Sequence, residues 1–142
     1  MDSVLPDPTT PRGERFARRL AEERIGWLTT VGADGTPQPN PVWFLWDQGT
    51  ILIYSLPDAA RLPHIRRNPR VSLNLNSNAQ GGDILVLTGD ARLSPDDPPA
   101  DQVPAYAEKY HEAIARSFGT PANFAAKYSV PIRITPTKAR GG

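Results

Sequence analysis

The stretch IGWLTTVGADGTPQPNPVWFLWDQGTILIYS, residues 25–55, decides the fold. Asp34-Gly35 is typical of a tight hairpin turn, because both residues tolerate the unusual backbone angles that such turns need. Runs rich in β-branched and aromatic residues flank it, so we predict strands at 25–31 and 38–47. A second turn, at Gln48-Gly49, leads to a strand at 50–55. Three successive strands joined by short turns indicate an antiparallel sheet.

The rest of the chain adds strands and a few helices. Val71, Leu73 and Leu75 alternate with polar residues, as expected of a strand with one buried face. The further strands are expected at 70–76, 83–93 and 130–138, and the helices at 12–24, 58–67 and 101–117, with a shorter helical turn at 121–127. Six strands with short turns predict a mainly β fold with flanking helices, a six-stranded antiparallel barrel. We expect a flexible leader at 1–11 and a single domain at 12–142.

Composition excludes several classes of function. The 142 residues include no cysteine, which rules out disulfides and thiolate chemistry. The net charge of +1 argues against a general nucleic-acid binder. No apolar run is long enough to span a bilayer and no signal peptide is evident, so we expect a cytoplasmic protein without a membrane partner. We find no nucleophile paired with a base and no metal-ligating cluster, and we predict neither catalytic side chains nor a metal site.

The strand at 38–47 has two apolar faces. Val42, Phe44 and Trp46 lie on one face, and Trp43 and Leu45 on the other. A small barrel needs only one apolar face in each strand, so the second face is expected to meet a partner subunit or a flat ligand. The alternative is that the N-terminal helix covers it.

The stretch 55–73 has the features of an anion site beside a sheet. Ser55 ends a strand, and Asp58 is expected to cap the helix that follows. Arg61 lies in the expected first turn, where the helix N-terminus also favours phosphate. We expect Arg61 to be largely exposed without ligand. The alternative is a surface helix whose arginines are only solvated.

Taken together, these segments resemble a known family. The run WLTTVGADGTPQPNPVWFLWDQGTILIYS, followed by NPRVSLNLN, resembles the split-barrel flavin-binding superfamily of pyridoxamine 5′-phosphate oxidase. The similarity covers about residues 14–94, with a weaker echo at 132–142. The resemblance implies an FMN-binding-like split barrel that forms a homodimer, with cofactor sites at the subunit interface.

The same resemblance implies which residues hold the cofactor, and it points to the branch that uses the deazaflavin coenzyme F-420. Basic residues that hold FMN in the oxidases are replaced here by Asn40, Leu45 and Ala60, and a hydroxyl residue by Ala59. The segment Pro41–Phe44 is similar to the deazaflavin branch. The implied cofactor-binding residues are Asn40, Pro41, Val42, Trp43, Tyr54, Ser55, Arg61 and Asn76.

We therefore expect an oxidoreductase that transfers hydride from reduced F-420 to a small organic acceptor. The coenzyme carries the hydride, so the protein needs to position it rather than to supply a nucleophile. One alternative is an FMN-dependent oxidase or reductase. Another is a non-catalytic carrier of F-420, flavin or a tetrapyrrole.

Overall fold

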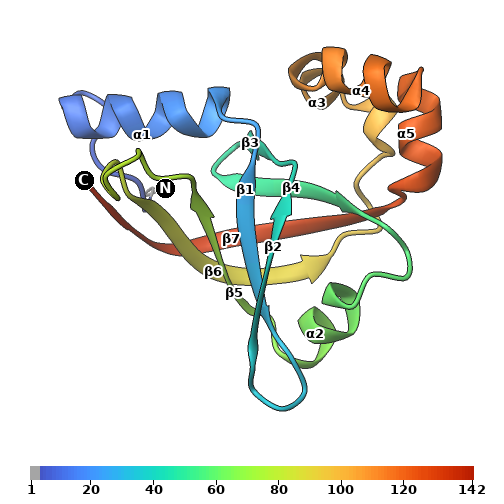
Figure 1. Ribbon diagram of the computed structural model, residues 1–142, viewed down its shortest axis with the longest axis horizontal. Helices are drawn as coiled ribbons and strands as arrows, with labels where there is room; N and C mark the ends of the chain where they lie inside the picture. Colours follow the sequence, from blue (N-terminus) through green and yellow to red (C-terminus); the bar gives the residue numbers. More distant parts are fainter. Residues whose placement is uncertain (1–3) are drawn as a thin grey trace.

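Seven antiparallel strands form one strongly curled sheet in the computed structural model, which describes residues 4–142 (Figure 1). The strands are β1 (Gly26–Val31), β2 (Pro37–Val42), β3 (Leu45–Asp47), β4 (Thr50–Ser55), β5 (Arg70–Leu75), β6 (Leu85–Leu93) and β7 (Val130–Gly141). Their order in the sheet is β2-β1-β5-β6-β7-β4-β3. The predicted split barrel with flanking helices is confirmed, with seven strands in place of six.

The extra strand arises because the predicted strand at 38–47 is broken in two. Its halves, β2 and β3, lie at opposite edges of the sheet and are joined only by Trp43 and Phe44. An edge-to-edge connection of two residues is possible only if the sheet curls until its edges approach each other. The break therefore accounts for the barrel shape.

Side chains from outside the sheet satisfy the backbone of Phe44 at this break. The Phe44 N–H donates to the Tyr110 hydroxyl oxygen at 2.7 Å, and the Lys109 amine donates to the Phe44 carbonyl oxygen at 2.8 Å. The Tyr110 hydroxyl also lies 2.7 Å from the carbonyl oxygen of Arg24, to which it can donate. Burial, and then the charge of Arg24, lowers the pKa of Lys109 to about 8. We call these contacts the Phe44 clamp.

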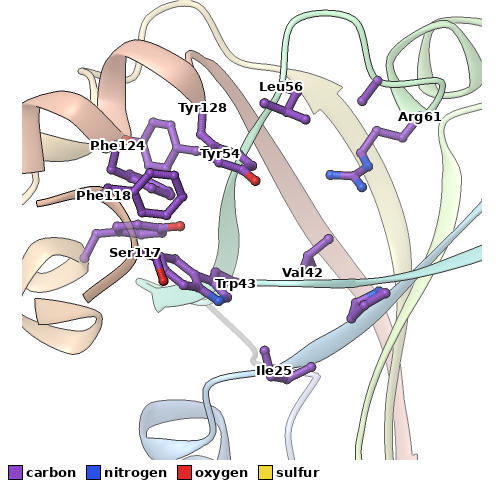
Figure 2. Close-up of a pocket in the computed structure, with 13 residues that line it drawn as sticks. Ile25, Val42, Trp43, Tyr54, Leu56, Arg61, Ser117, Phe118, Phe124 and Tyr128 are labelled. Atoms are coloured by element: carbon purple, nitrogen blue, oxygen red, sulfur yellow. The ribbon is translucent and has the colours of Figure 1, made fainter. Parts of the chain in front are cut away.

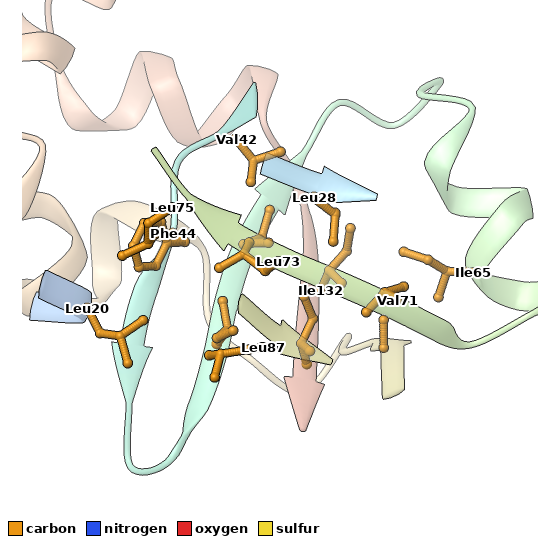
Figure 3. Close-up of a cluster of buried hydrophobic side chains, with 14 of the residues drawn as sticks. Leu20, Leu28, Val42, Phe44, Ile65, Val71, Leu73, Leu75, Leu87 and Ile132 are labelled. Carbon is orange, nitrogen blue, oxygen red and sulfur yellow. The ribbon is translucent and has the colours of Figure 1, made fainter. Parts of the chain in front are cut away.

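The inner face of the curled sheet encloses the main hydrophobic core (Figure 3). Alternate strand residues such as Ile51, Ile53, Leu73 and Leu87 point into it. One end is closed by α1 (Pro11–Glu22), whose Phe16 and Leu20 are fully buried. The core therefore belongs to the sheet together with the N-terminal helix.

Part of the segment before α1 packs against the rest of the chain. Leu5 packs against the main core, and the Thr10 side chain caps α1 by accepting from the Gly13 N–H at 3.0 Å. The expected flexible leader at 1–11 thus includes a packed part, while residues 1–3 lie outside the described residues.

A helical layer covers the outer face of β3 and β4 (Figure 1). It consists of the 3-10 turn η1 (Ala100–Gln102), α3 (Pro104–Lys109), α4 (His111–Phe118) and α5 (Pro121–Lys127). The single helix predicted at 101–117 was wrong: it is interrupted at Tyr110, whose backbone leaves the helical region at φ −107° and ψ 17°.

The second apolar face of 42–46 packs against this layer. Leu45 is part of a second core with Leu52, Tyr54 and residues of the helical layer, and Trp43 packs beside them. The chain's own helical layer thus covers most of this face, where we expected a partner subunit or a flat ligand, and Trp43 still lines a pocket beside it. The alternative of the N-terminal helix was wrong, because that helix packs on the main core. This strand therefore provides no evidence for a dimer.

The helix after β4 starts later than predicted. It is α2 (Arg61–Arg67), and Ala60 precedes it without a side-chain hydrogen bond, so Asp58 does not cap it. Pro63 explains the shift, because proline is tolerated in the first turn of a helix but not further inside. Leu62 and Ile65 anchor α2 in the main core.

Among residues 4–142, no helix is long and apolar enough to cross a bilayer.

The Phe44 clamp is tested by Tyr110→Phe. The substitution leaves the buried Phe44 N–H without an acceptor, which we expect to lower the free energy of unfolding by about 1–3 kcal/mol. Urea denaturation measures the change. Tyr128→Phe is the matched control, because the Tyr128 hydroxyl has no hydrogen bond within the described chain, and it should change stability little. Equal effects of the two substitutions would contradict the clamp.

Candidate functional site

A pocket of about 440 Å³ lies between the sheet, α2 and the helical layer (Figure 2). Its sheet side is lined by Ile25, Pro41, Val42, Trp43, Tyr54, Leu56, Ala59 and Arg61, and its helical side by Tyr106, Ser117, Phe118, Phe124 and Tyr128. A volume in this range suits a small-molecule ligand.

Aromatic rings form most of the wall on the helical side. Trp43 stacks on Tyr110 with ring centroids 4.5 Å apart and an angle of 3° between the planes, and on Phe124 at 5.2 Å. Phe124 stacks in turn on Tyr128 at 4.9 Å. Flat, locked ring surfaces of this kind favour a planar ligand. Trp43, which we expected to contact a cofactor ring, is thus already held by rings of its own chain.

Arg61 is the charged group of the pocket. Figure 2 shows its side chain extending from α2 across the pocket toward the aromatic residues. The side chain is half-buried rather than largely exposed, which corrects our expectation. Burial lowers the pKa of its guanidinium, and the nearby Tyr128 opposes this only in part.

No carboxylate and no hydrogen-bond acceptor pairs with Arg61 anywhere in residues 4–142. A partly desolvated cation without a partner is costly, and an anion bound in the pocket relieves that cost.

Arg133 on β7, unlike Arg61, pairs with carboxylates of the described chain. Its guanidinium donates to Asp47 at 2.8 Å and also pairs with Asp97, which holds the pKa of the Asp97 carboxyl below its usual value. This network ties β7 to β3 and to the loop after β6. The charge of Arg133 is thus neutralised within the chain, whereas that of Arg61 is not within the described residues.

The pocket brings together five of the eight cofactor-binding residues implied by the sequence: Pro41, Val42, Trp43, Tyr54 and Arg61. The Tyr54 hydroxyl donates to the Pro98 carbonyl oxygen at 2.6 Å, and burial raises its pKa to about 12. Tyr54 therefore contributes an uncharged ring to the pocket, and its hydroxyl already has a hydrogen-bond acceptor.

The other three predicted residues lie elsewhere. Ser55 is fully buried, does not line the pocket, and donates to the Leu56 carbonyl oxygen at 3.0 Å. Asn40 is exposed on the edge strand β2. Asn76 accepts from the Trp27 indole N–H at 2.9 Å and borders a second cavity beside Trp27, Asn74 and Ile84. Within one chain, these residues do not share a site with Arg61.

The residues that sequence reasoning missed come mainly from the helical layer. Phe118, Phe124 and Tyr128 line the helical side of the pocket, although the segment that carries them was expected only as short helical structure. Their aromatic spacing along 118–128 was the available signal. No group of three or more metal-ligating side chains occurs in the part of the chain that the structure describes.

A family model described as pyridoxamine 5′-phosphate oxidase matches residues 13–141. The chain belongs to this family. The match spans the whole sheet and the helical layer. Among curated proteins, no match was found.

Solved structures of the family's fold agree with this assignment. An F-420 reductase superposes with a TM-score of 0.68 at 25% identity, covering 92% of this chain and 98% of that one. A putative pyridoxamine 5′-phosphate oxidase from Listeria innocua gives 0.63 at 24% identity, covering 89% and 94%. An FAD-binding protein from Mesorhizobium loti gives 0.60 at 20% identity, covering 89% and 88%. At their lower identities, the last two structures show only that this chain has the same fold.

Proposed function

We propose that this protein is an oxidoreductase that binds coenzyme F-420 in the aromatic pocket and serves hydride transfer to a small organic acceptor. The observation that carries the proposal is the unpaired, half-buried Arg61 at the edge of a planar, aromatic-walled pocket. F-420 combines a planar ring system with a phosphodiester, which matches these two features. The similarity to an F-420 reductase supports the same choice.

The residues present fit such a coenzyme at two points. Arg61 offers a fork of donors to a phosphodiester. Pro41, Val42 and Trp43 line the pocket where β2 ends and offer an apolar surface to a ring. When bound, reduced F-420 supplies the hydride. The chain's own part is to orient the ring, hold the anion and keep water away from the reacting atoms with the rings of the helical layer.

FMN remains the alternative cofactor, because the fold is that of a flavin-binding family and FMN also joins a planar ring to a phosphate. A carrier without turnover is the other alternative. An activated alkene added to the protein with reduced F-420 distinguishes an enzyme from a carrier. With an enzyme, the absorbance of the oxidised coenzyme recovers; with a carrier, it does not.

We expect F-420 to bind at least tenfold more tightly than FMN, which corresponds to about 1.4 kcal/mol. The reason is that Arg61 is the only basic side chain lining the pocket, whereas a terminal phosphate monoester carries more charge to neutralise. Titration of one ligand-free sample with both compounds measures the ratio. Equal affinities, or FMN that copurifies in stoichiometric amount, would favour the flavin alternative.

Arg61→Ala should weaken F-420 binding by about 10- to 150-fold, because it removes a charge-assisted hydrogen bond worth about 1.5–3 kcal/mol. Stability should not fall, since the guanidinium has no partner among residues 4–142 to lose. Arg66→Ala is the matched control: Arg66 lies on the same helix but is exposed, so its smaller effect should vanish at high salt. Wild-type binding by Arg61→Ala would show that the anion lies elsewhere.

We also propose that the protein is a homodimer. Trp27 and Ile84 are large apolar side chains that are 36% and 41% exposed, and both border the cavity that contains Asn76. A partner seated there would cover them and would bring Asn76 into an interface. Light scattering at micromolar concentration should give twice the mass of one chain. Trp27→Ser should lower the measured mass to that of a single chain. A monomeric wild-type protein would end this proposal.

A further inference from the structure

Tyr106 is a buried tyrosine with an unused hydroxyl. The residue is fully buried, its side chain belongs to the wall of the aromatic pocket, and its hydroxyl oxygen has no hydrogen-bond partner within the described residues. Buried hydroxyl groups almost always have a partner, so such an exception needs an explanation.

Neighbouring tyrosines show that the chain can satisfy hydroxyls in this layer. Tyr54 packs edge-on against Tyr106 with ring centroids 5.0 Å apart, and its hydroxyl donates to Pro98. Tyr110 lies 5.1 Å from Tyr106, and its hydroxyl holds the Phe44 backbone. Of these three tyrosines in contact, Tyr106 alone lacks a partner among residues 4–142. Tyr128 also lines the pocket without a hydrogen-bond partner in the described chain, but it is partly exposed, so water can satisfy its hydroxyl.

The surroundings of Tyr106 define the partner that it can accept. Burial raises the pKa of its hydroxyl well above the ordinary value, so the group stays protonated and acts as a donor. The ionisable groups that influence it are Tyr110, Tyr54 and Tyr128, none of which is a cation. A carboxylate or phosphate would be desolvated there without a counter-charge. The fitting partner is therefore an uncharged oxygen acceptor.

We propose that Tyr106 is a specificity-determining residue whose hydroxyl donates a hydrogen bond to the carbonyl oxygen of an uncharged, planar organic molecule bound in the aromatic pocket. The stacked rings of Trp43, Phe124 and Tyr128 supply the flat apolar walls for that molecule. The inference deepens the proposed function by naming the chemical class of the acceptor, and rests on it for the acceptor's role. Tyr106 has no accessible surface of its own, so this hydrogen bond requires that side chains of the pocket wall shift to admit the carbonyl.

The test compares a ketone with a hydrocarbon of the same shape, 1-tetralone and tetralin, on the protein without cofactor. Wild type should prefer the ketone by about 2- to 13-fold, the range expected for one hydrogen bond. Tyr106→Phe should abolish the preference and leave tetralin binding unchanged. The infrared carbonyl stretch of bound 1-tetralone should lie at lower frequency in wild type than in Tyr106→Phe, a difference that a merely structural role would not produce.

Tyr110→Phe is the control, because it removes a hydroxyl from the same cluster at a residue that does not line the pocket. It should keep the ketone preference although it loses stability, whereas Tyr106→Phe should lose the preference without losing stability. Persistence of the preference in Tyr106→Phe, absence of the carbonyl shift, or a loss of stability equal to that of Tyr110→Phe would each overturn the proposal. The assay contains no F-420, so its failure is separate from a failure of the proposed cofactor.

Discussion

The backbone of Phe44 is the point on which the rest of the structure depends. Trp43 and Phe44 join the two edges of one sheet, and neither edge strand supplies hydrogen bonds for Phe44. Tyr110 and Lys109 do so from the helical layer. A buried peptide group without partners would cost enough to favour a continuous strand. The helical layer is therefore what permits the break, and the break is what lets the sheet close around its core.

The same contacts create the pocket. Once Tyr110 is fixed by Phe44, it interrupts the helix at its own position and presents its ring to Trp43. Trp43 then stacks on Phe124, and Phe124 on Tyr128, so one row of rings runs from the sheet break to the end of α5. Arg61 faces this row from α2, and no carboxylate of the described part of the chain neutralises it. Packing and electrostatics are thus both compatible with the planar, anionic coenzyme that we propose.

Local patterns predicted most of the fold. The Asp34-Gly35 turn, the alternation at 71–75 and the apolar faces of 42–46 each depend on neighbours in sequence, and each prediction was confirmed. The predictions that failed have two causes: contacts with distant residues, and a local proline that we overlooked. Tyr110 is 66 residues from Phe44, so nothing near residue 44 shows that the strand stops there. Asp58 was a reasonable cap by its type, but Pro63 restricts the helix to a later start.

The site was predicted in part for a related reason. The resemblance assigned both Tyr54 and Ser55 to the cofactor, yet neighbours in a strand point to opposite faces. In β4, Leu52 and Tyr54 face the helical layer and the pocket, while Ile51 and Ile53 face the main core, and Ser55 follows their alternation into the interior. Its hydroxyl is then satisfied by the adjacent Leu56 carbonyl. One chain therefore offers an anion the guanidinium of Arg61 without this hydroxyl, and a ligand held by a single cation depends more strongly on the shape of the aromatic wall.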